Sequence, residues 1–389
     1  MNARILVLMA FVLMVSCAAP MGSDSGAHSA IEAVLQKRAM AVVANDVAAF
    51  RSTVDDARPA LRRTQQDLFD MMRARGGGST MTKVLRLETY GAYTRAYVDD
   101  SPELMLFGTS GPTSYKRVYF RQEAGTWLVT EPKADELGAE KRQRVGDIEI
   151  ENWAIDDDIV ASVAKEVTAL RQEVAKTVPS ASLGAISLRL YPTSDTIGLA
   201  IVSGAAAAHP INLSRDATLR VYDLWWTSSP GALAPFSRFV LRDQLLGMAR
   251  EQLAPLAFLR MDWWLRYGPG HAAGGPDPGA AMRDVCSDPL TWKQMFDGPH
   301  KDDAMASGMG GDTFVPTYEA FMSPMAPRAF AQARSMIEYL RAIHGDRAYW
   351  DLVVAYGDGQ APNAAYATAI SVSLERFYSE WLTWARARC

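Results

Sequence analysis

The sequence predicts an α+β protein of two unequal parts, because the spacing of its apolar residues changes along the chain. From residue 29 the apolar residues recur at helical spacing, and from Lys83 they give way to short runs rich in β-branched and aromatic residues. A charged segment then leads into a second series that ends in helical periodicity. We therefore expect helices on a curved antiparallel sheet over 29–133, a linker over 134–147, and a domain over 148–389 with a small sheet and a mainly helical C-terminal half.

An export signal is predicted at the N-terminus. One Arg precedes an apolar stretch from Ile5 to Val15, and the stretch stops just before Cys17, as in a signal peptide. It is too short for a stable membrane span, which takes roughly 20 residues. The residues Leu13–Cys17 resemble a bacterial lipobox. The resemblance implies that 1–17 is a lipoprotein signal peptide and that the thiol of Cys17 carries a lipid.

The residues after Cys17 predict how the body is attached. Residues 18–28 are small and polar and include Pro and Gly, which is typical of a flexible tether. The lipobox resemblance further implies the outer membrane, facing the periplasm, because Ala18 rather than Asp follows the cysteine. The alternative is an ordinary secretory signal that is removed together with Cys17.

The other two cysteines are Cys286 and Cys389. An exported chain meets an oxidising compartment, in which a disulfide between them would persist. Two unrelated thiols are the alternative, since separation in sequence does not give the distance that bond geometry requires.

Length and charge narrow the classes of function. The chain has 389 residues, more than one hydrophobic core usually organises, and 49% of them are hydrophobic, so two domains with ample cores are expected. The net charge is −4, so the sequence does not indicate a basic surface that would bind a phosphate backbone. This argues against a nucleic-acid partner.

Two helices and four strands are expected in the front domain. An amphipathic helix opens it at Ser29, and a second helix from Pro59 to Arg75 stops at the breaker Gly76-Gly77-Gly78. The four runs predicted as antiparallel strands are 83–100, 103–108, 114–122 and 125–132.

The segments AIEAVLQKRAMAVVANDVAAF and YFRQEAGTWLVT, with this order of helices and strands, resemble the SnoaL-like, or nuclear-transport-factor-like, cone domain. The resemblance implies an apolar pocket between helix and sheet. Some relatives are isomerases with an Asp/His pair, and Glu88, Asp99 or Asp100 would stand in that role. The alternative is that these are charges at strand ends, because the domain has no His after His28.

The large domain begins with a helix from Ile159 to Val178, whose buried side carries apolar residues at helical spacing. Strand patterns follow from Ile186 and again over 211–226, and a further helix is expected over Phe236–Leu253.

This order of elements, with ISLRLYPTSD, YLRAIHGDRAYWDLV and LERFYSEWLTWAR in sequence, resembles the gluzincin metallopeptidases of the peptidase MA-like superfamily. The resemblance covers Ile148 to Arg388. In that family a helix carries HExxH, in which two His hold one zinc and the Glu activates its water, and a later Glu is the third ligand.

Every one of these ligands is replaced in this chain. Arg242, Asp243 and Leu246 stand at the HExxH positions, and Tyr267 stands at the position of the third ligand. Leu has no lone pair, and Arg242 brings a fixed positive charge. The five histidines are His28, His209, His271, His300 and His344, and no two of them fall within one helical turn. No zinc, other metal or cofactor is therefore expected, and no catalytic residue is assigned.

Two alternatives stay open for the histidines and the tryptophans. Asp243, Asp262, His271 and His300 would make an improvised zinc site, or His271 and His300 are solvated loop residues. A cleft suited to a ligand would be lined by aromatic side chains and His271, or the same tryptophans belong to the core. The tryptophans concerned are Trp225, Trp226, Trp263 and Trp264.

Three functions follow as hypotheses. The first is a lipid-anchored envelope protein with a catalytically inactive, peptidase-like domain that binds a peptide, a protein or a small apolar ligand. The second is a hydrolase with a non-standard site. The third is a structural envelope scaffold.

Overall fold

Most of the N-terminal half and the C-terminal helices are described by the structure, a computed structural model. The described residues are 23–74, 83–99, 114–178, 186–193, 218–222, 225–227, 233, 235–254, 257, 261–262, 264–265, 268–269, 285–287, 289 and 326–389. They contain helices and largely antiparallel sheets, so the α+β class expected from the sequence holds.

Three helices open the described chain. They are α1 (Ser23–Val43), α2 (Val47–Arg51) and α3 (Pro59–Ala74). Both predicted helices are present, but residues 23–28, which were expected to belong to the tether, form the first turns of α1. The side chain of His28 explains the difference, since its Nε2 lies 2.9 Å from the carbonyl oxygen of Val84 and holds this end of α1 against the sheet.

Four consecutive strands form an antiparallel sheet, called sheet A below. They are β1 (Lys83–Tyr90), β2 (Tyr93–Asp99), β3 (Ser114–Glu123) and β4 (Thr126–Thr130), in the order β1-β2-β3-β4. The run 83–100, which was predicted as one strand, is a hairpin. Gly91 has a φ of +55°, a conformation that glycine adopts without steric cost, and turns the chain so that Tyr90 lies opposite Tyr93. The predicted strand 103–108 lies outside the described residues.

One face of sheet A packs against α1. Ile31 of α1 and Ala96, Val98 and Phe120 of the sheet are fully buried in one apolar cluster. A second cluster joins α1, α2 and α3, where the rings of Phe50 and Phe69 lie 5.2 Å apart. Helices on a sheet are therefore present in the front part, as expected.

Sheet A also contains a strand from the second half of the chain. β9 (Trp225–Thr227) pairs antiparallel with β3, and Trp226 lies opposite Tyr115. The expected division at 134–147 does not separate two independent sheets, because a strand of the second part completes the first. A strand pattern was predicted over 211–226, but its pairing with β3 was not, since the two strands lie far apart along the chain.

A second sheet, called sheet B, follows directly. Its strands are β5 (Glu140–Val145), β6 (Ile148–Trp153), β7 (Ile186–Tyr191) and β8 (Thr218–Tyr222). β5 pairs antiparallel with β6, whereas β6, β7 and β8 are parallel.

The segment 134–147, which was expected to be a linker, contains the short helix η1 (Ala134–Glu136) and the edge strand β5. An edge strand pairs with one neighbouring strand only and can carry charged residues. The charged residues of β5 therefore did not indicate a strand in the sequence. The Arg142 side chain pairs with Glu149 and Glu151 of β6, which explains how a charged segment joins a sheet.

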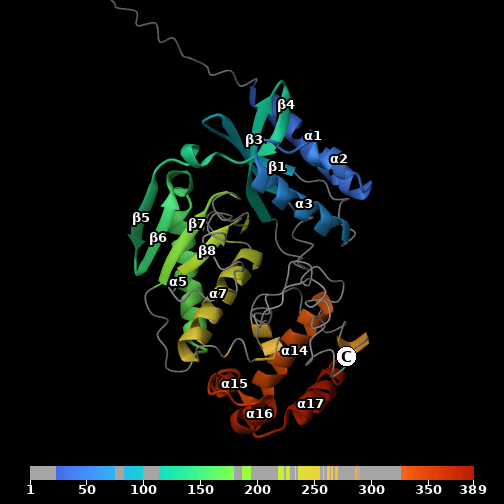
Figure 1. Ribbon diagram of the computed structural model, residues 1–389, viewed down its shortest axis with the longest axis vertical. Coiled ribbons are helices and arrows are strands. Elements are labelled where there is room, and N and C mark those ends of the chain that lie inside the picture. The colour runs from blue at the N-terminus through green and yellow to red at the C-terminus, as the bar shows by residue number, and fades with distance from the viewer. Residues whose placement is uncertain are drawn as a thin grey trace, which may run out of the picture.

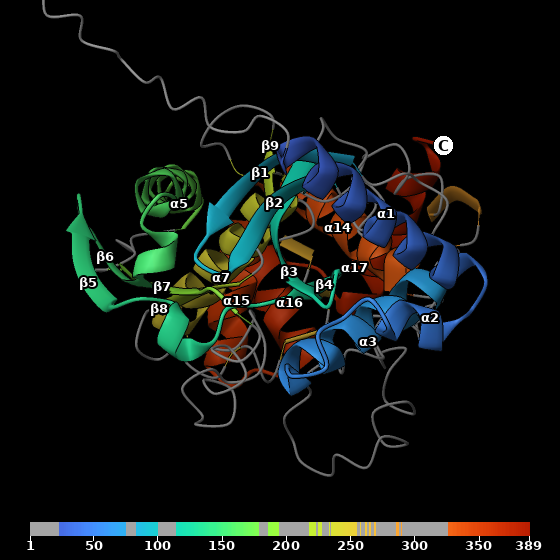
Figure 2. The same ribbon diagram turned by 90° about the horizontal axis from the view of Figure 1, so that it is seen from above.

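Helices α5 (Val160–Ala175) and α7 (Pro235–Leu253) cover one face of sheet B (Figure 2). Both helices were predicted. The expected buried residues of α5, including Val163, Val167 and Leu170, are all in the core, together with Ile150 of β6 and Leu188 of β7.

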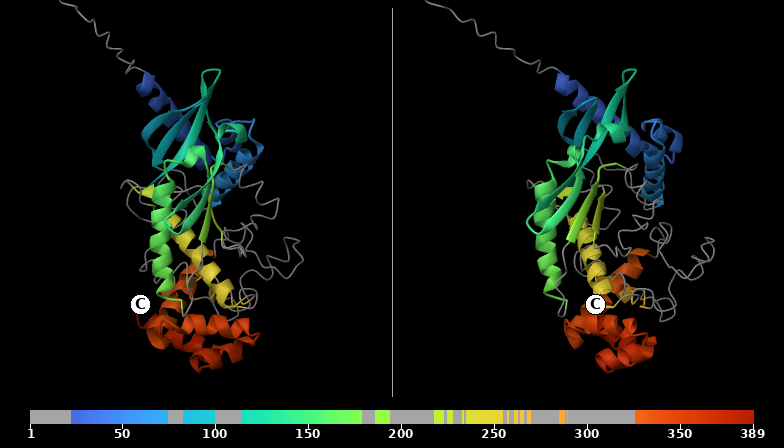
Figure 3. Two further views of the ribbon diagram at one scale, coloured as in Figure 1. Left: turned by 90° about the vertical axis from the view of Figure 1, so that its left-hand side faces the viewer. Right: turned by 60° about the vertical axis from the view of Figure 1, so that its left-hand side comes forward.

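The chain ends in four helices. They are α14 (Ala326–His344), α15 (Ala348–Gly357), α16 (Pro362–Ile370) and α17 (Leu374–Arg386). Their boundaries follow local rules, because Pro362 opens α16, Ser371 ends it in the left-handed conformation, and the Ser373 side chain caps α17. The mainly helical end expected from the sequence is present. The front helices and sheet A lie at one end of the molecule and α15, α16 and α17 at the other (Figures 1 and 3).

No helix in the described part of the chain combines the length and the apolar character needed to cross a bilayer.

A disulfide ties the C-terminus to the body. Cys286 and Cys389 are bonded, with Cα atoms 5.7 Å apart. Of the two alternatives left open by the sequence, the structure has the bonded one. The bond joins residues 103 positions apart, so it closes a long loop in the unfolded chain.

Loss of this bond should lower stability strongly. Cys286→Ser or Cys389→Ser should each reduce the free energy of unfolding by about 3–5 kcal/mol, because a loop of roughly 100 residues regains its freedom in the unfolded state. The double variant should be no less stable than either single variant, since all three lack the same bond. Urea unfolding under non-reducing conditions measures this. Additive losses in the double variant would contradict the pairing.

Candidate functional site

Helix α7 carries the positions that the family resemblance assigns to zinc ligands. Arg242 lies where α7 meets α5, and its guanidinium Nη1 is 3.5 Å from a carboxylate oxygen of Glu173 on α5. One turn earlier, Arg238 pairs with both Glu166 and Glu173. The two arginines and two glutamates thus form a ladder of ion pairs between the helices.

The charge state of Arg242 fits this role. Burial lowers the pKa of Arg242, Glu173 raises it, and the nearby Arg341 and Arg238 lower it further. Guanidinium stays protonated at any physiological pH, so Arg242 is a permanent cation at this contact.

Leu246 stands one turn beyond Arg242 and is 4% exposed, within the large core beneath sheet B. Arg242 and Leu246 are one helical turn apart, as the spacing of HExxH requires. Arg242 makes an ion pair, however, and Leu246 packs in the core. The side chains of Asp243 and Tyr267 lie outside the described residues.

Trp264 belongs to the core rather than to an open cleft. It is fully buried, and its ring stacks on Phe377 of α17 with centroids 5.4 Å apart. Tyr339, Tyr366 and His344 also surround Phe377, which makes it the centre of an aromatic cluster between the C-terminal helices. The core alternative left open by the sequence therefore applies to Trp264.

The other candidates for a cleft are only partly described. Trp225 and Trp226 lie in β9, on the edge of β3, and their side chains are outside the described residues. Trp263, His271 and His300 also lie outside the described residues.

Asp262, considered above as a metal ligand, is bound by two tyrosines. The hydroxyl of Tyr356 donates a hydrogen bond of 2.6 Å to its Oδ2, and that of Tyr366 donates one of 3.3 Å to the same atom. Burial raises the pKa of Tyr366 well above its usual value, and the charge of Asp262 raises it further, so this phenol stays protonated and keeps donating. The contact joins the residues after α7 to α15 and α16.

Glu88, a candidate acid or base by family resemblance, lies at the centre of an ionic network instead of at a strand end. Its carboxylate accepts hydrogen bonds from Arg95, at 2.6 Å, and from the hydroxyl of Tyr97, and it pairs with Arg86 at 3.1 Å. Burial by itself would raise the pKa of Glu88, but the hydrogen bond and charge of Arg95 and the bond from Tyr97 lower it overall. A carboxylate held in its charged form this way is a poor proton acceptor.

The same network crosses from sheet A to sheet B. Arg117 of β3 pairs at 2.6 Å with Asp156, in the short helix η2 (Ala154–Asp156) that follows β6, and at 3.5 Å with Asp158. Arg95 reaches Asp158 as well, at 3.2 Å. Three arginines and three carboxylates therefore join the second face of sheet A to the start of α5. We call this set, which comprises Arg86, Glu88, Arg95, Arg117, Asp156 and Asp158, the inter-sheet network.

Asp156 is the most buried member of the network, with 1% of its surface exposed. Burial raises the pKa of Asp156, while the charge and hydrogen bond of Arg117 lower it. The sequence prediction missed this network. Alternating residues at 93, 95 and 97 and at 115, 117 and 119 are aromatic or arginine, and a run of three aspartates, Asp156-Asp157-Asp158, occurs later in the chain. That alternation was the available signal, because it places all six side chains on one face of a sheet.

Asp99 lies at the end of β2, opposite Lys83 of β1 and Tyr115 of β3. Asp100 lies outside the described residues. In the described part of the chain, the side chains that contact Glu88 are those of Arg86, Arg95 and Tyr97.

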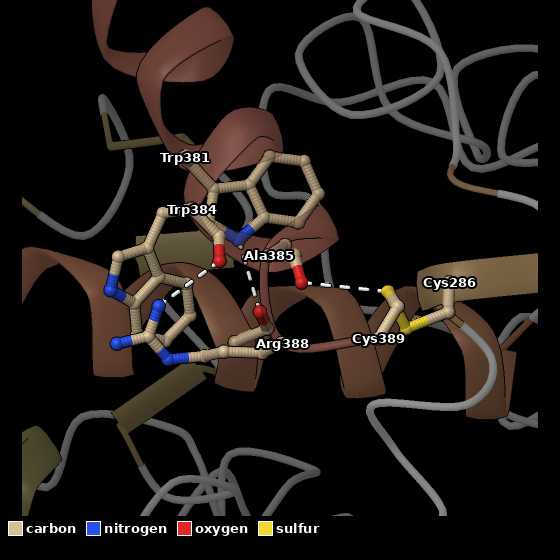
Figure 4. The surroundings of a disulfide bond; sticks show 7 residues. Cys286, Trp381, Trp384, Ala385, Arg388 and Cys389 are labelled. Carbon is tan, nitrogen blue, oxygen red and sulfur yellow. Dashed lines mark hydrogen bonds between the residues drawn. A yellow bond between two sulfur atoms is a disulfide. The ribbon is translucent and has the colours of Figure 1, made fainter.

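The disulfide lies beside α17. The sulfur of Cys389 is 3.5 Å from the carbonyl oxygen of Ala385, and Trp381 and Trp384 project from the preceding turns (Figure 4). Trp381 donates a hydrogen bond of 3.0 Å to the hydroxyl of Ser335 on α14, so α17 is joined to α14 about two turns before the bonded Cys389.

Within the described ranges, no group of three or more His, Cys, Asp or Glu side chains is arranged to hold a metal ion.

Comparison with known proteins adds no relative, since no family model, no curated protein and no solved structure matches this chain.

Removal of one partner from the inter-sheet network should be costly. Arg117→Met leaves the Asp156 carboxylate buried without its closest cation, which should lower the free energy of unfolding by about 3–5 kcal/mol at neutral pH. Without Arg117 the pKa of Asp156 rises further above its unfolded value. A raised carboxyl pKa favours the folded state below the unfolded pKa and disfavours it above, so the variant should be less destabilised at acid pH than at pH 7.

The control for this experiment is the double variant Arg117→Met/Asp156→Asn, in which no buried charge remains at the pair. It should recover part of the lost stability and show a weaker pH dependence than Arg117→Met. Urea unfolding at several pH values measures both effects. Equal destabilisation of Arg117→Met at all pH values would contradict the assignment.

Proposed function

We propose that this chain is a lipid-anchored protein of the bacterial envelope, with a catalytically inactive, peptidase-like domain that binds a peptide or an envelope protein. Three features support the proposal together. They are the lipobox ending at Cys17, a disulfide between Cys286 and Cys389 that suits an oxidising compartment, and the chemistry of α7.

The observation that carries the proposal is the packing of α7. At the positions that would hold zinc, Arg242 pairs with Glu173 of the neighbouring helix and Leu246 lies in the core. A zinc ligand must offer a lone pair. The guanidinium of Arg242 is permanently protonated and the side chain of Leu246 is an alkyl group, so neither offers one. Arg242 and Leu246 both have structural contacts, so a stable fold does not need zinc ligands at these two positions.

The finer fold assignments belong to the same proposal. Helix α1 on one face of an antiparallel sheet, with α2 and α3 packed against α1, supports a SnoaL-like cone for the front part. Sheet B with α5 and α7, followed by α14 to α17, supports a gluzincin-like domain for the remainder. Both likenesses rest on the order of elements.

A structural scaffold is the second candidate, and a specific observation favours it. β9 and the inter-sheet network connect the two parts at several points, which suits a rigid spacer between partners as well as a binding protein.

The test is peptide cleavage by the purified full chain, with and without a metal chelator, together with elemental analysis. We expect no cleavage above that of the buffer, no effect of the chelator and no stoichiometric zinc. Cleavage that a chelator abolishes would contradict the proposal and favour the hydrolase. In that case Asp262→Asn, compared with Asp358→Asn on the surface, would show whether the Asp262 carboxylate takes part.

A further inference from the structure

The start of α1 is fixed rigidly to sheet A. His28 Nε2 lies 2.9 Å from the carbonyl oxygen of Val84, and the Val84 amide donates a hydrogen bond of 3.2 Å to Glu32. Ile31, between these contacts, is fully buried against the sheet. The point at which the chain enters the folded body therefore has a defined place, next to the first residues of β1.

Few residues separate this point from the proposed lipid. Residues 18–22 lie between Cys17 and Ser23, the first residue of α1. Fully extended, five residues reach about 18 Å. A lipid on Cys17 therefore holds the beginning of α1, and with it the beginning of β1, close to the surface of the bilayer.

The first residues of β1 suit a lipid surface. β1 is the edge strand of sheet A, and the register shifts between Val84 and Arg86, so Leu85 is a bulged residue with no partner in the ladder. Leu85 is 48% exposed, and the exposed side chains of Lys83 and Arg86 flank it. We call Lys83, Leu85 and Arg86 the β1 patch.

The β1 patch itself carries two positive charges, while Asp99 lies opposite Lys83 and Glu32 lies beside Val84. Arg86 shares Glu88 with Arg95, and its guanidinium rests on the ring of Tyr97, with 3.9 Å to the centroid. The arginine is thereby held at the surface, with 59% of its side chain exposed. Two cations around an exposed leucine complement the negative headgroups and the apolar boundary of a phospholipid surface.

We propose that the β1 patch and the first turns of α1 face an anionic phospholipid membrane, and that α15, α16 and α17 point away from it. The proposal rests on the lipid attachment of the proposed function. The views of the whole molecule agree with this direction, since α1 begins at the end opposite to α15, α16 and α17 (Figures 1 and 3). The C-terminal helices are then the part that is free to meet other envelope components.

Energy transfer from the protein to the bilayer tests this placement. A donor dye is attached at Ser29→Cys on α1 or at Thr368→Cys on α16, both exposed positions, while the native cysteines stay bonded. The lipidated full chain is placed in vesicles of phosphatidylethanolamine and phosphatidylglycerol that carry an acceptor lipid. We expect higher transfer from Ser29→Cys than from Thr368→Cys.

Two further changes separate the contribution of tether length from that of the patch. A Gly/Ser linker inserted between Gly22 and Ser23 should lower the transfer from Ser29→Cys. Lys83→Glu should lower it as well, whereas Lys165→Glu, an equal change of charge on α5, should leave it unchanged. Replacing phosphatidylglycerol by a neutral lipid should have the same effect as Lys83→Glu.

The outcomes distinguish the two proposals. Equal transfer from both sites, or higher transfer from Thr368→Cys, in a chain that still floats with the vesicles would overturn the placement and leave the lipid anchor intact. Unchanged transfer in both Lys83→Glu and neutral vesicles would overturn the role of the β1 patch. A chain that does not float, and takes up no fatty acid, would overturn the anchor and the placement together.

Discussion

The contact between α5 and α7 is the constraint on which the interpretation of the second part depends. Arg238 and Arg242 on one helix and Glu166 and Glu173 on the other form ion pairs along the contact, and the large core lies directly beneath. Each of these charges is partly shielded from water and has an oppositely charged partner. Removing one of them leaves its partner's charge partly buried and uncompensated, which costs more free energy than the intact ion pair contributes. The side chains of α7 at this contact, Arg238 and Arg242, therefore have a structural role.

A second constraint joins the two parts of the chain. β9 extends sheet A from within the second part, and the inter-sheet network connects the other face of sheet A to the start of α5. One face of sheet A is thus packed by apolar side chains from α1. On the other face, Tyr93 and Tyr119 pack with Leu137 and Ile155, beside the arginines and carboxylates of the inter-sheet network. Both faces are used, so the front part and sheet B form a specific contact to which apolar and charged side chains both contribute.

The sequence predicted the helices and strands in which apolar residues recur at regular spacing. It did not predict features that depend on contacts with residues far away along the chain. The valines of α5 at helical spacing predicted a helix and its buried side, because one apolar face settles both. β5 was missed because its charges find partners only across the ladder, and the hairpin at Gly91 was missed because one glycine was the only break in a continuous β pattern. The strand pattern that contains β9 was predicted, but its pairing with β3 and the inter-sheet network depend on residues far apart in the chain, which no local pattern records. At the candidate site, the sequence showed that Arg242 and Leu246 stand at the positions which the proposed resemblance assigns to zinc ligands, whereas the partner of Arg242 became visible only in the fold.

The central claim is that Arg242 is a structural cation of the contact between α5 and α7, and a double-mutant cycle on Arg242 and Glu173 tests it most directly. The stability of Arg242→Met, Glu173→Gln and the double variant is measured against the parent chain. The account predicts a favourable coupling free energy of about 0.5 kcal/mol or more between the two side chains. A coupling free energy of zero would contradict it, because Arg242 would then be available for another role on α7.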